Sequence, residues 1–232
     1  MRASGILMPV ASLPSEYGIG AFSKEAYKFV DMLKKAGQRY WQILPLGPTG
    51  YGDSPYQSFS TFAGNPYFID LNTLVKKGWL KKKECRACDF GNDSRYIDYE
   101  KIYLNRFEIL KKAFKRSGIE SAPEFQTFCK ENEEWLDDYA LYMKLKQANG
   151  GKSWSEWADP YRLRNAEALE AFRKEHKKGI RFQKFLQFEF LEEWKALKDY
   201  ANHKGIEIIG DIPIYVAFDS ADAWAHPELF QF

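Results

Sequence analysis

The first 45 residues alternate between short apolar runs and one amphipathic stretch, and this order constrains the fold more than any other feature. Residues 4–8 and 40–44 are mostly apolar and short enough to be buried strands. Between them, Ser23 is a suitable helix N-cap, Gly37 a suitable helix end, and apolar residues recur at helical spacing. Strand, helix and strand in this order predict a βαβ unit, and therefore a parallel sheet in an α/β protein.

The remainder of the chain predicts a long helical part and then a return to the sheet. Residues 73–180 show no strand pattern, but they carry apolar stripes at helical spacing, one of them formed by Tyr103, Phe107, Leu110 and Phe114. A strong helix is predicted at 182–203 and a third strand at 206–209. We therefore expect three parts. Residues 1–72 hold the first two strands and a loop, residues 73–180 a helical subdomain, and residues 181–232 a helix and the third strand.

Composition narrows the classes of partner. The 232 residues include 34 basic and 32 acidic residues, which leave a net charge of +2, and nothing in this balance calls for nucleic acid or a membrane surface. No segment approaches the roughly 18 uninterrupted apolar residues of a membrane-spanning helix. We expect no nucleic-acid partner and no membrane association.

The cysteines indicate a reducing compartment and no metal site. There are three, Cys85, Cys88 and Cys129, which is too sparse and odd a set for a disulfide framework. Cys85 and Cys88 have the spacing of a zinc-binding pair, but the remaining cysteine and the three histidines are far away in sequence. The N-terminal apolar run is interrupted by Pro9 and Pro14, which is unlike a signal peptide. We expect a cytoplasmic protein without a bound metal.

The stretch that follows the second predicted strand, GPTGYGDSPYQS at 47–58, carries the chemistry. It is rich in Gly and Pro, so it forms a loop rather than continuing the strand. It also holds two aromatic rings, Tyr51 and Tyr56, and three polar side chains, Asp53, Ser54 and Gln57. A sugar needs a flat face to stack on and hydrogen-bonding partners for its hydroxyl groups, so we interpret this loop as a sugar-binding site.

Three segments resemble glycoside hydrolase family 77, the bacterial 4-alpha-glucanotransferases. They are SGILMPVASLP with GIG (4–14 and 18–20), WQILPLGP with SPYQS and NPY (41–48, 54–58 and 65–67), and GDIPIYV with DSA (210–216 and 219–221). The resemblance spans the chain but covers only the N-terminal half of a typical family member. It implies that the three strands belong to an eight-stranded TIM barrel carrying a large helical insertion.

The resemblance also implies an activity. Members cut an α-1,4-glucan, hold one piece as a covalent glycosyl-enzyme and pass it to glucose or to another glucan. Such retaining chemistry uses two carboxylates about 5 Å apart and no organic cofactor. In the family these carboxylates follow later barrel strands, so we expect the nucleophile and the acid/base downstream of Phe232 and no catalytic residue in this chain.

Roles for individual residues follow from the same resemblance. Tyr56 matches a tyrosine that stacks on the donor sugar, Tyr51 matches a residue of a secondary glucan-binding surface, and Asp211 matches an aspartate that orients the catalytic groups. The three polar loop residues named above are candidate partners for sugar hydroxyls. The wider amylase clan often has a histidine near the third strand, whereas this chain has Tyr215 and Val216, which favours the glucanotransferases.

Three functions remain open at this point. The chain is the N-terminal half of a glucanotransferase, a truncated module that binds maltooligosaccharides and α-1,4-glucans without turnover, or part of an α-amylase-like hydrolase. Three strands cannot close an eight-stranded barrel, so we expect the missing C-terminal half as a partner. Alone, the strand at 206–209 is an exposed apolar edge that favours instability or association.

Overall fold

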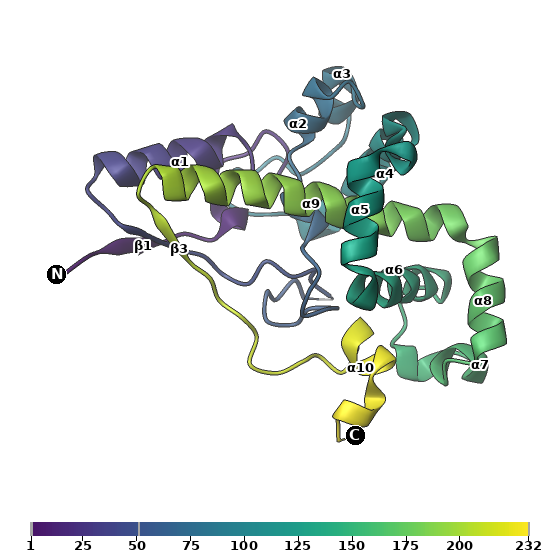
Figure 1. The fold of residues 1–232 in the computed structure, drawn as a ribbon. Coiled ribbons are helices and arrows are strands. Elements are labelled where there is room, and N and C mark those ends of the chain that lie inside the picture. The colour runs from purple at the N-terminus through teal and green to yellow at the C-terminus, as the bar shows by residue number, and fades with distance from the viewer. Residues whose placement is uncertain (1, 51, 232) are drawn as a thin grey trace. The chain divides into compact units, whose positions relative to one another are not determined.

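Three short parallel strands form one sheet in the order β1-β2-β3 in a computed structural model that describes residues 2–50 and 52–231 (Figure 1). β1 (Gly5–Leu7) pairs with β2 (Tyr40–Gln42), and β2 pairs with β3 (Glu207–Ile209). The predicted α/β class and parallel sheet are confirmed. Each observed strand is shorter than the apolar run that predicted it.

The helix between the first two strands forms for the predicted reasons. In α1 (Lys24–Lys35), the Ser23 hydroxyl accepts a hydrogen bond from the Glu25 amide at 3.3 Å, which satisfies one free N–H of the first turn. Gly37, with φ of 72°, takes the left-handed conformation beyond the last turn. The buried face of α1 is made by Ala26, Val30 and Leu33.

Between β2 and β3 the described residues form helices and loops. The α-helices of this region are α2 (Leu71–Lys76), α3 (Lys82–Arg86), α4 (Tyr99–Ser117), α5 (Pro123–Glu131), α6 (Glu133–Ala148), α7 (Asp159–Arg162), α8 (Ala166–Glu175) and α9 (Lys177–His203). After β3 comes α10 (Ala221–Ala225). Short 3₁₀ turns are η1 (Val10–Ser12), η2 (Pro66–Phe68), η3 (Ile119–Ser121), η4 (Trp154–Glu156) and η5 (Pro227–Leu229). The helix predicted at 182–203 is confirmed as α9 and begins five residues earlier, at Lys177.

The chain divides into two compact units, and each takes its residues from three separate segments. Unit 1 comprises Met1–Leu46, Asn65–Gly118 and Glu189–Ile212, and unit 2 comprises Gly47–Gly64, Ile119–Phe188 and Pro213–Phe232. The sheet belongs to unit 1 and the predicted sugar-binding loop to unit 2. The three-part division predicted from the sequence, with boundaries after residues 72 and 180, stays a prediction.

In unit 1, α1 and the C-terminal half of α9 lie side by side next to the sheet (Figure 1). Their contact includes Tyr27 and Tyr200, whose ring centroids are 5.0 Å apart, and the Tyr200 hydroxyl donates to Asp31 at 2.8 Å. Trp41 of β2 is fully buried, and its indole N–H donates to the Met8 carbonyl at 2.8 Å. These contacts join the two helices to each other and β2 to the residue that follows β1.

Unit 1 also buries several ionisable side chains. Glu193 is 7% exposed, and a carboxyl oxygen of its side chain accepts from the Asp70 amide at 2.7 Å. Burial raises the pKa of Glu193 well above the usual value. The fully buried Glu189 is paired with Lys77, whose Nζ lies 2.6 Å from the carboxylate. Arg106, 1% exposed, donates to a backbone carbonyl at 2.5 Å. Polar groups are therefore built into this core and not confined to its surface.

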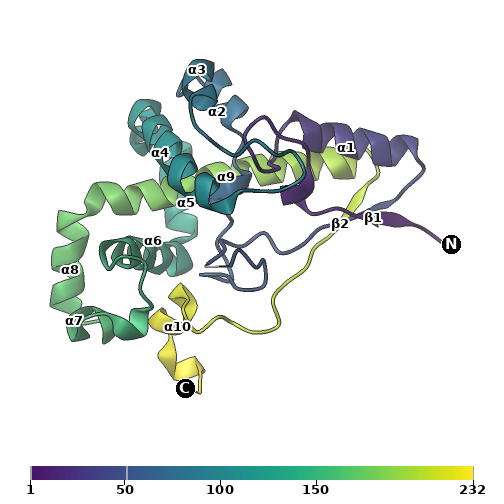
Figure 2. The same ribbon diagram turned by 180° about the vertical axis from the view of Figure 1, so that it is seen from behind.

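Unit 2 has an aromatic core formed by helices and by the loop after β2. Figure 2 shows α10 beside α6, in agreement with their contacts. Tyr142 is fully buried among the rings of Trp157 and Trp224, with centroids at 5.3 and 5.9 Å. The remaining buried members are Ala63, Tyr139, Ala140, Leu141, Leu145, Leu169, Phe172, Ile180 and Ala221.

Candidate functional site: the Tyr56 loop

The segment Gly47–Gly64, here called the Tyr56 loop, is folded back on itself. Thr49 and Ser58 form an antiparallel bridge, and the Phe59 amide donates to the Pro48 carbonyl at 3.1 Å. A Cβ on Gly47 would lie 2.4 Å from the Ser58 hydroxyl, so only glycine allows the two arms to approach this closely. Gly50 and residues 52–57 consequently form the tip of a narrow, hairpin-like loop.

Four predicted binding residues are brought together at this tip. The backbone of Asp53 is left-handed (φ 53°), and its carboxylate accepts from the Thr49 hydroxyl at 3.4 Å. Burial raises the pKa of Asp53. The Ser54 hydroxyl accepts from the Tyr56 amide at 3.3 Å, and the Ser54 carbonyl from the Gln57 amide at 3.1 Å. Asp53 and Ser54 therefore shape the tip as well as offering oxygens to a ligand.

Two side chains at the tip remain accessible. Tyr56 is 47% exposed, and Gln57 is also exposed. An exposed ring beside an exposed amide, on a loop whose backbone is internally hydrogen-bonded, can stack on a sugar and bind its hydroxyl groups. Tyr51 lies outside the described residues.

The other predicted binding residue, Asp211, belongs to unit 1 and not to the loop's unit. It follows β3 by two residues, is half-buried, and its carboxylate accepts from the Ile212 amide at 2.9 Å. Beyond it, Ile212, Ile214 and Tyr215 are 80%, 91% and 84% exposed. Asp211 thus lies beyond the carboxyl end of a parallel strand, where ligand-binding groups of α/β proteins commonly lie.

A buried glutamine that the sequence analysis missed anchors the C-terminal arm of the loop. Gln187 of α9 is fully buried, its Oε1 accepts from the Gly64 amide at 2.7 Å, and its Nε2 donates to the Gly64 carbonyl at 2.9 Å. Both backbone groups of a buried residue are satisfied by one side chain. The available signal was a glutamine between the apolar residues Leu186 and Phe188 of a long helix.

A second missed anchor is the carboxylate of Asp222, in the first turn of α10. It accepts from the amide and the hydroxyl of Thr61, at 2.8 and 3.3 Å, and the neighbouring Ala221 amide donates to the Phe59 carbonyl at 2.8 Å. Burial raises the pKa of Asp222. The arm that follows Tyr56 is therefore tied to a helix far along the chain.

A third missed group is an ion pair beneath the loop. Lys146 of α6 is buried and lies 2.5 Å from a carboxylate oxygen of Asp219, whose other oxygen accepts from the Tyr142 hydroxyl at 2.6 Å. The Lys146 ammonium also lies 4.9 Å from the ring centroid of Phe59, within cation–π range. Burial raises the pKa of Tyr142, so its hydroxyl stays a donor to Asp219.

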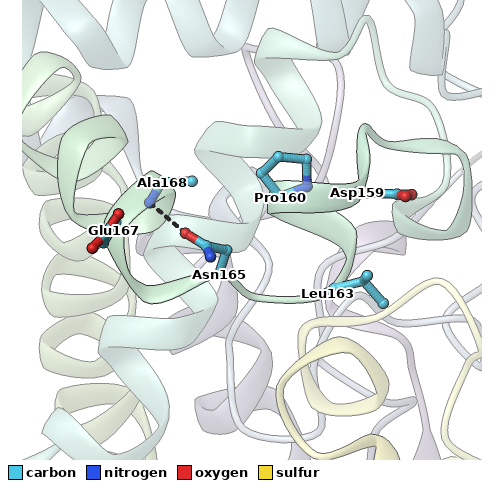
Figure 3. A pocket seen from close by; sticks show the side chains of 6 residues that line it. All are labelled: Asp159, Pro160, Leu163, Asn165, Glu167 and Ala168. Atoms are coloured by element: carbon cyan, nitrogen blue, oxygen red, sulfur yellow. Dashed lines mark hydrogen bonds between the residues drawn. The ribbon is translucent and has the colours of Figure 1, made fainter.

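A cavity of about 560 Å³ lies elsewhere in unit 2, beside α7 and α8 (Figure 3). Within it, the Asn165 side chain accepts from the Ala168 amide at 3.0 Å and thereby caps α8. The residues lining it are Asp159, Pro160, Leu163, Asn165, Glu167 and Ala168. None of the predicted binding residues is among them, so the Tyr56 loop and not this cavity is the candidate site.

The cysteines Cys85, Cys88 and Cys129 are free thiols, and burial raises the pKa of each. Over residues 2–50 and 52–231, no three His, Cys, Asp or Glu side chains are grouped so that they could hold a metal ion. In the same residues, no helix combines the length and the apolar character needed to span a bilayer.

These features define an α/β protein in which polar loops extend from the carboxyl ends of parallel strands and one of them presents an accessible tyrosine. Comparison with known proteins identifies the family. The 4-alpha-glucanotransferase profile of glycoside hydrolase family 77 matches residues 8–232, and the chain belongs to this family. The family resemblance found in the sequence is thereby confirmed.

Individual relatives agree with this assignment. The chain is 49% identical over 223 residues to a 4-alpha-glucanotransferase of Clostridium butyricum, covering 96% of this chain and 46% of the relative. It is 49% identical over 232 residues to that of Streptococcus pneumoniae, covering 99% and 46%. A solved amylomaltase from Streptococcus agalactiae in complex with acarbose superimposes with a TM-score of 0.96 at 42% identity, covering 100% of this chain and 47% of that one. The chain spans about half the length of these relatives.

Proposed function

We propose that this chain is part of a 4-alpha-glucanotransferase that transfers a segment of an α-1,4-glucan to glucose or to another α-1,4-glucan by a retaining double displacement. The observation that carries the proposal is the superposition, over the whole chain, on an amylomaltase whose structure holds acarbose. The catalytic carboxylates are expected outside residues 1–232. The role proposed for this chain is to bind the glucan.

Within this role, Tyr56 stacks on the donor glucose, and Asp53, Ser54 and Gln57 bind hydroxyl groups. The exposure of the Tyr56 ring and the internal hydrogen bonds of the tip support this assignment, because a ligand then meets an ordered surface and loses less freedom to the loop. Asp211 orients the catalytic groups from beyond β3. The role proposed for Tyr51 is that of a residue in a secondary glucan-binding surface.

The fold proposed for the complete protein is the eight-stranded barrel, with the helical region between β2 and β3 as its insertion. Ile6, Leu7 and Ile209 of β1 and β3 are 41%, 53% and 43% exposed, although apolar strand residues in a closed barrel are covered on both faces. The partner proposed for this surface is the C-terminal half of the barrel. The proposed location is the cytoplasm, on the basis of the sparse, unpaired cysteines.

The test of glucan binding is calorimetric titration of the chain with maltotetraose. Replacing Tyr56 by Ala removes the stacking face, and we expect the affinity to fall roughly three- to tenfold. Tyr96 is the matched control, because it is also an exposed tyrosine (74%) but is not part of the loop. Equal affinities of the Tyr56→Ala and wild-type chains would contradict the assignment of Tyr56.

The reaction is tested separately with maltotriose. A mixture of the chain and the C-terminal half should release glucose and form longer maltooligosaccharides, and the chain alone should bind without either product. Reducing sugars released without longer products would indicate an α-amylase-like hydrolase instead. Turnover by the chain alone would contradict the expectation that its catalytic residues lie elsewhere.

A further inference from the structure

The hydrogen bonds between the Tyr56 loop and α10 involve two loop residues, Phe59 and Thr61. The Phe59 carbonyl, the Thr61 amide and the Thr61 hydroxyl all bond to Ala221 or Asp222, at 2.8, 2.8 and 3.3 Å. Thr61 and Asp222 are 161 positions apart in sequence. None of these three groups belongs to the residues proposed to touch the sugar.

The α10 side of this contact is firmly held. The Ser220 hydroxyl is fully buried and accepts from the Ala223 amide at 3.1 Å, which caps the helix. Trp224, 1% exposed, donates its indole N–H to the Tyr161 carbonyl at 2.9 Å, and the guanidinium of Arg164 lies 4.2 Å from its ring centroid. Because these contacts hold α10 in the core of unit 2, the helix can restrain the position of a loop that is bonded to it.

On the loop side, the contact is close to the binding tip. Phe59 and Ser58 pair with the opposite arm through Pro48 and Thr49, and the tip that carries Tyr56 lies directly beyond this pairing. Ser60 is buried (3% exposed), and its hydroxyl accepts from the amides of Phe62 and Ala63, which follow Thr61. A displacement of residues 59–61 is therefore transmitted through the paired arms to the tip.

We propose that Asp222 is a positioning residue for glucan binding, which holds the Tyr56 loop against α10 so that the Tyr56 ring is presented to the sugar. The proposal rests on the proposed glucan-binding function. Asp222 itself touches no sugar in this scheme. Its carboxylate supplies two acceptors, one for the amide and one for the hydroxyl of Thr61. Among ionisable side chains of this length, only that of aspartate offers two acceptors.

The first experiment measures hydrogen exchange of the 232-residue chain, without any sugar. Asp222→Ala removes both acceptors, so both bonds from Thr61 are lost. We expect roughly tenfold faster exchange of the amides between Phe59 and Gly64, and no change in α4 of unit 1. Asp159→Ala is the control, because Asp159 is an exposed aspartate of unit 2.

The second experiment measures maltotetraose affinity of the same variants and of Leu169→Ala, which destabilises unit 2 by a cavity in its core. A positioning role predicts a roughly three- to tenfold loss of affinity for Asp222→Ala, and unchanged affinity for Leu169→Ala at temperatures where both are folded. Equal losses in these two variants would mean that Asp222 acts only through stability.

The two readouts separate the possible failures. Wild-type exchange of the loop in Asp222→Ala overturns the proposal whether or not maltotetraose binds. Faster exchange with unchanged affinity shows that the contact with α10 is real but does not position the tip, and this also overturns the proposal. If the wild-type chain binds no maltotetraose, the proposed function and the positioning role both fail, while the exchange data still report on the contact itself.

Discussion

Gln187 offers a sharp test of how the Tyr56 loop is held. Replacing it by Met preserves the length and volume of the side chain and removes its hydrogen-bonding groups. Both backbone groups of Gly64 then lose their partners at 2.7 and 2.9 Å in a fully buried position. Because a buried polar group left without a partner costs about 1 to 3 kcal/mol, the two together predict a loss of about 2 to 6 kcal/mol in the free energy of unfolding.

The assay is urea unfolding of the chain followed by tryptophan fluorescence, with a thermal melt as a second measure. For a chain of this size, each kcal/mol lowers Tm by about 2–4 °C, so a shift of about 4–24 °C is expected. The slope of the free energy against urea should stay the same, because the surface exposed on unfolding is unchanged. The transition that reports on unit 2 should move, since both Gln187 and Gly64 belong to it.

Gln126→Met is the matched control, because Gln126 is exposed and makes one long bond, 3.3 Å, to a backbone carbonyl. Its effect should stay within about 0.5 kcal/mol of the wild type. If Gln187→Met is as stable as this control, the Gly64 groups do not depend on Gln187, and the account of the loop anchor given above is wrong.

Two further predictions concern buried charges. Lys146→Met should lower the free energy of unfolding by about 3 kcal/mol, because Asp219 loses the cation with which it is paired. Urea unfolding measures this difference, with Lys144→Met as the control. Equal stabilities of the two variants would contradict the prediction. Glu193 has a pKa raised in the folded state by burial, so its contribution is complete below the unfolded pKa near 4.5 and is lost as pH rises through the folded pKa. Glu193→Gln should therefore gain stability relative to the wild type as pH rises above about 4.5, and a pH-independent difference in urea unfolding would refute this.

The sheet and its crossover helix could be predicted because their signals are local. Ser23, the spaced apolar residues of α1 and Gly37 each act within one turn of the helix, so a short window of sequence contains the whole argument. The strands were predicted too long, because an apolar run shows which residues can be buried and not where the backbone pairing ends.

The buried face of α4 was predicted only in part. The expected stripe included Tyr103 and Leu110, of which Leu110 is fully buried but Tyr103 is 61% exposed. The buried face instead includes Arg106, whose charge breaks the apolar pattern. A backbone carbonyl in unit 1 accepts from this guanidinium, and a partner supplied by tertiary structure leaves no trace in helical periodicity.

The same limit applies to the site. The tip residues Asp53, Ser54 and Gln57 could be singled out because a loop rich in Gly, Pro and polar residues has a recognisable composition. Gln187 and Asp222, which hold the arms of that loop, are polar residues of helices and are ordinary until their distant partners are known. The sequence therefore singled out the candidate binding residues of the tip, which stay a prediction, but not the distant residues that hold the loop.

The interleaving of the two units sets an order of events during synthesis on the ribosome. β2 is complete within the first 42 residues, but its neighbour β3 emerges only at Glu207, and the α10 partner of Thr61 follows later still. Neither unit can close before the residues from Glu207 onward have been translated, and neither corresponds to a continuous stretch that could be excised and expressed. In a nascent chain of this kind, apolar surfaces of the strands and the loop stay exposed until their partners have been synthesised. Chaperones can bind these surfaces during this long interval.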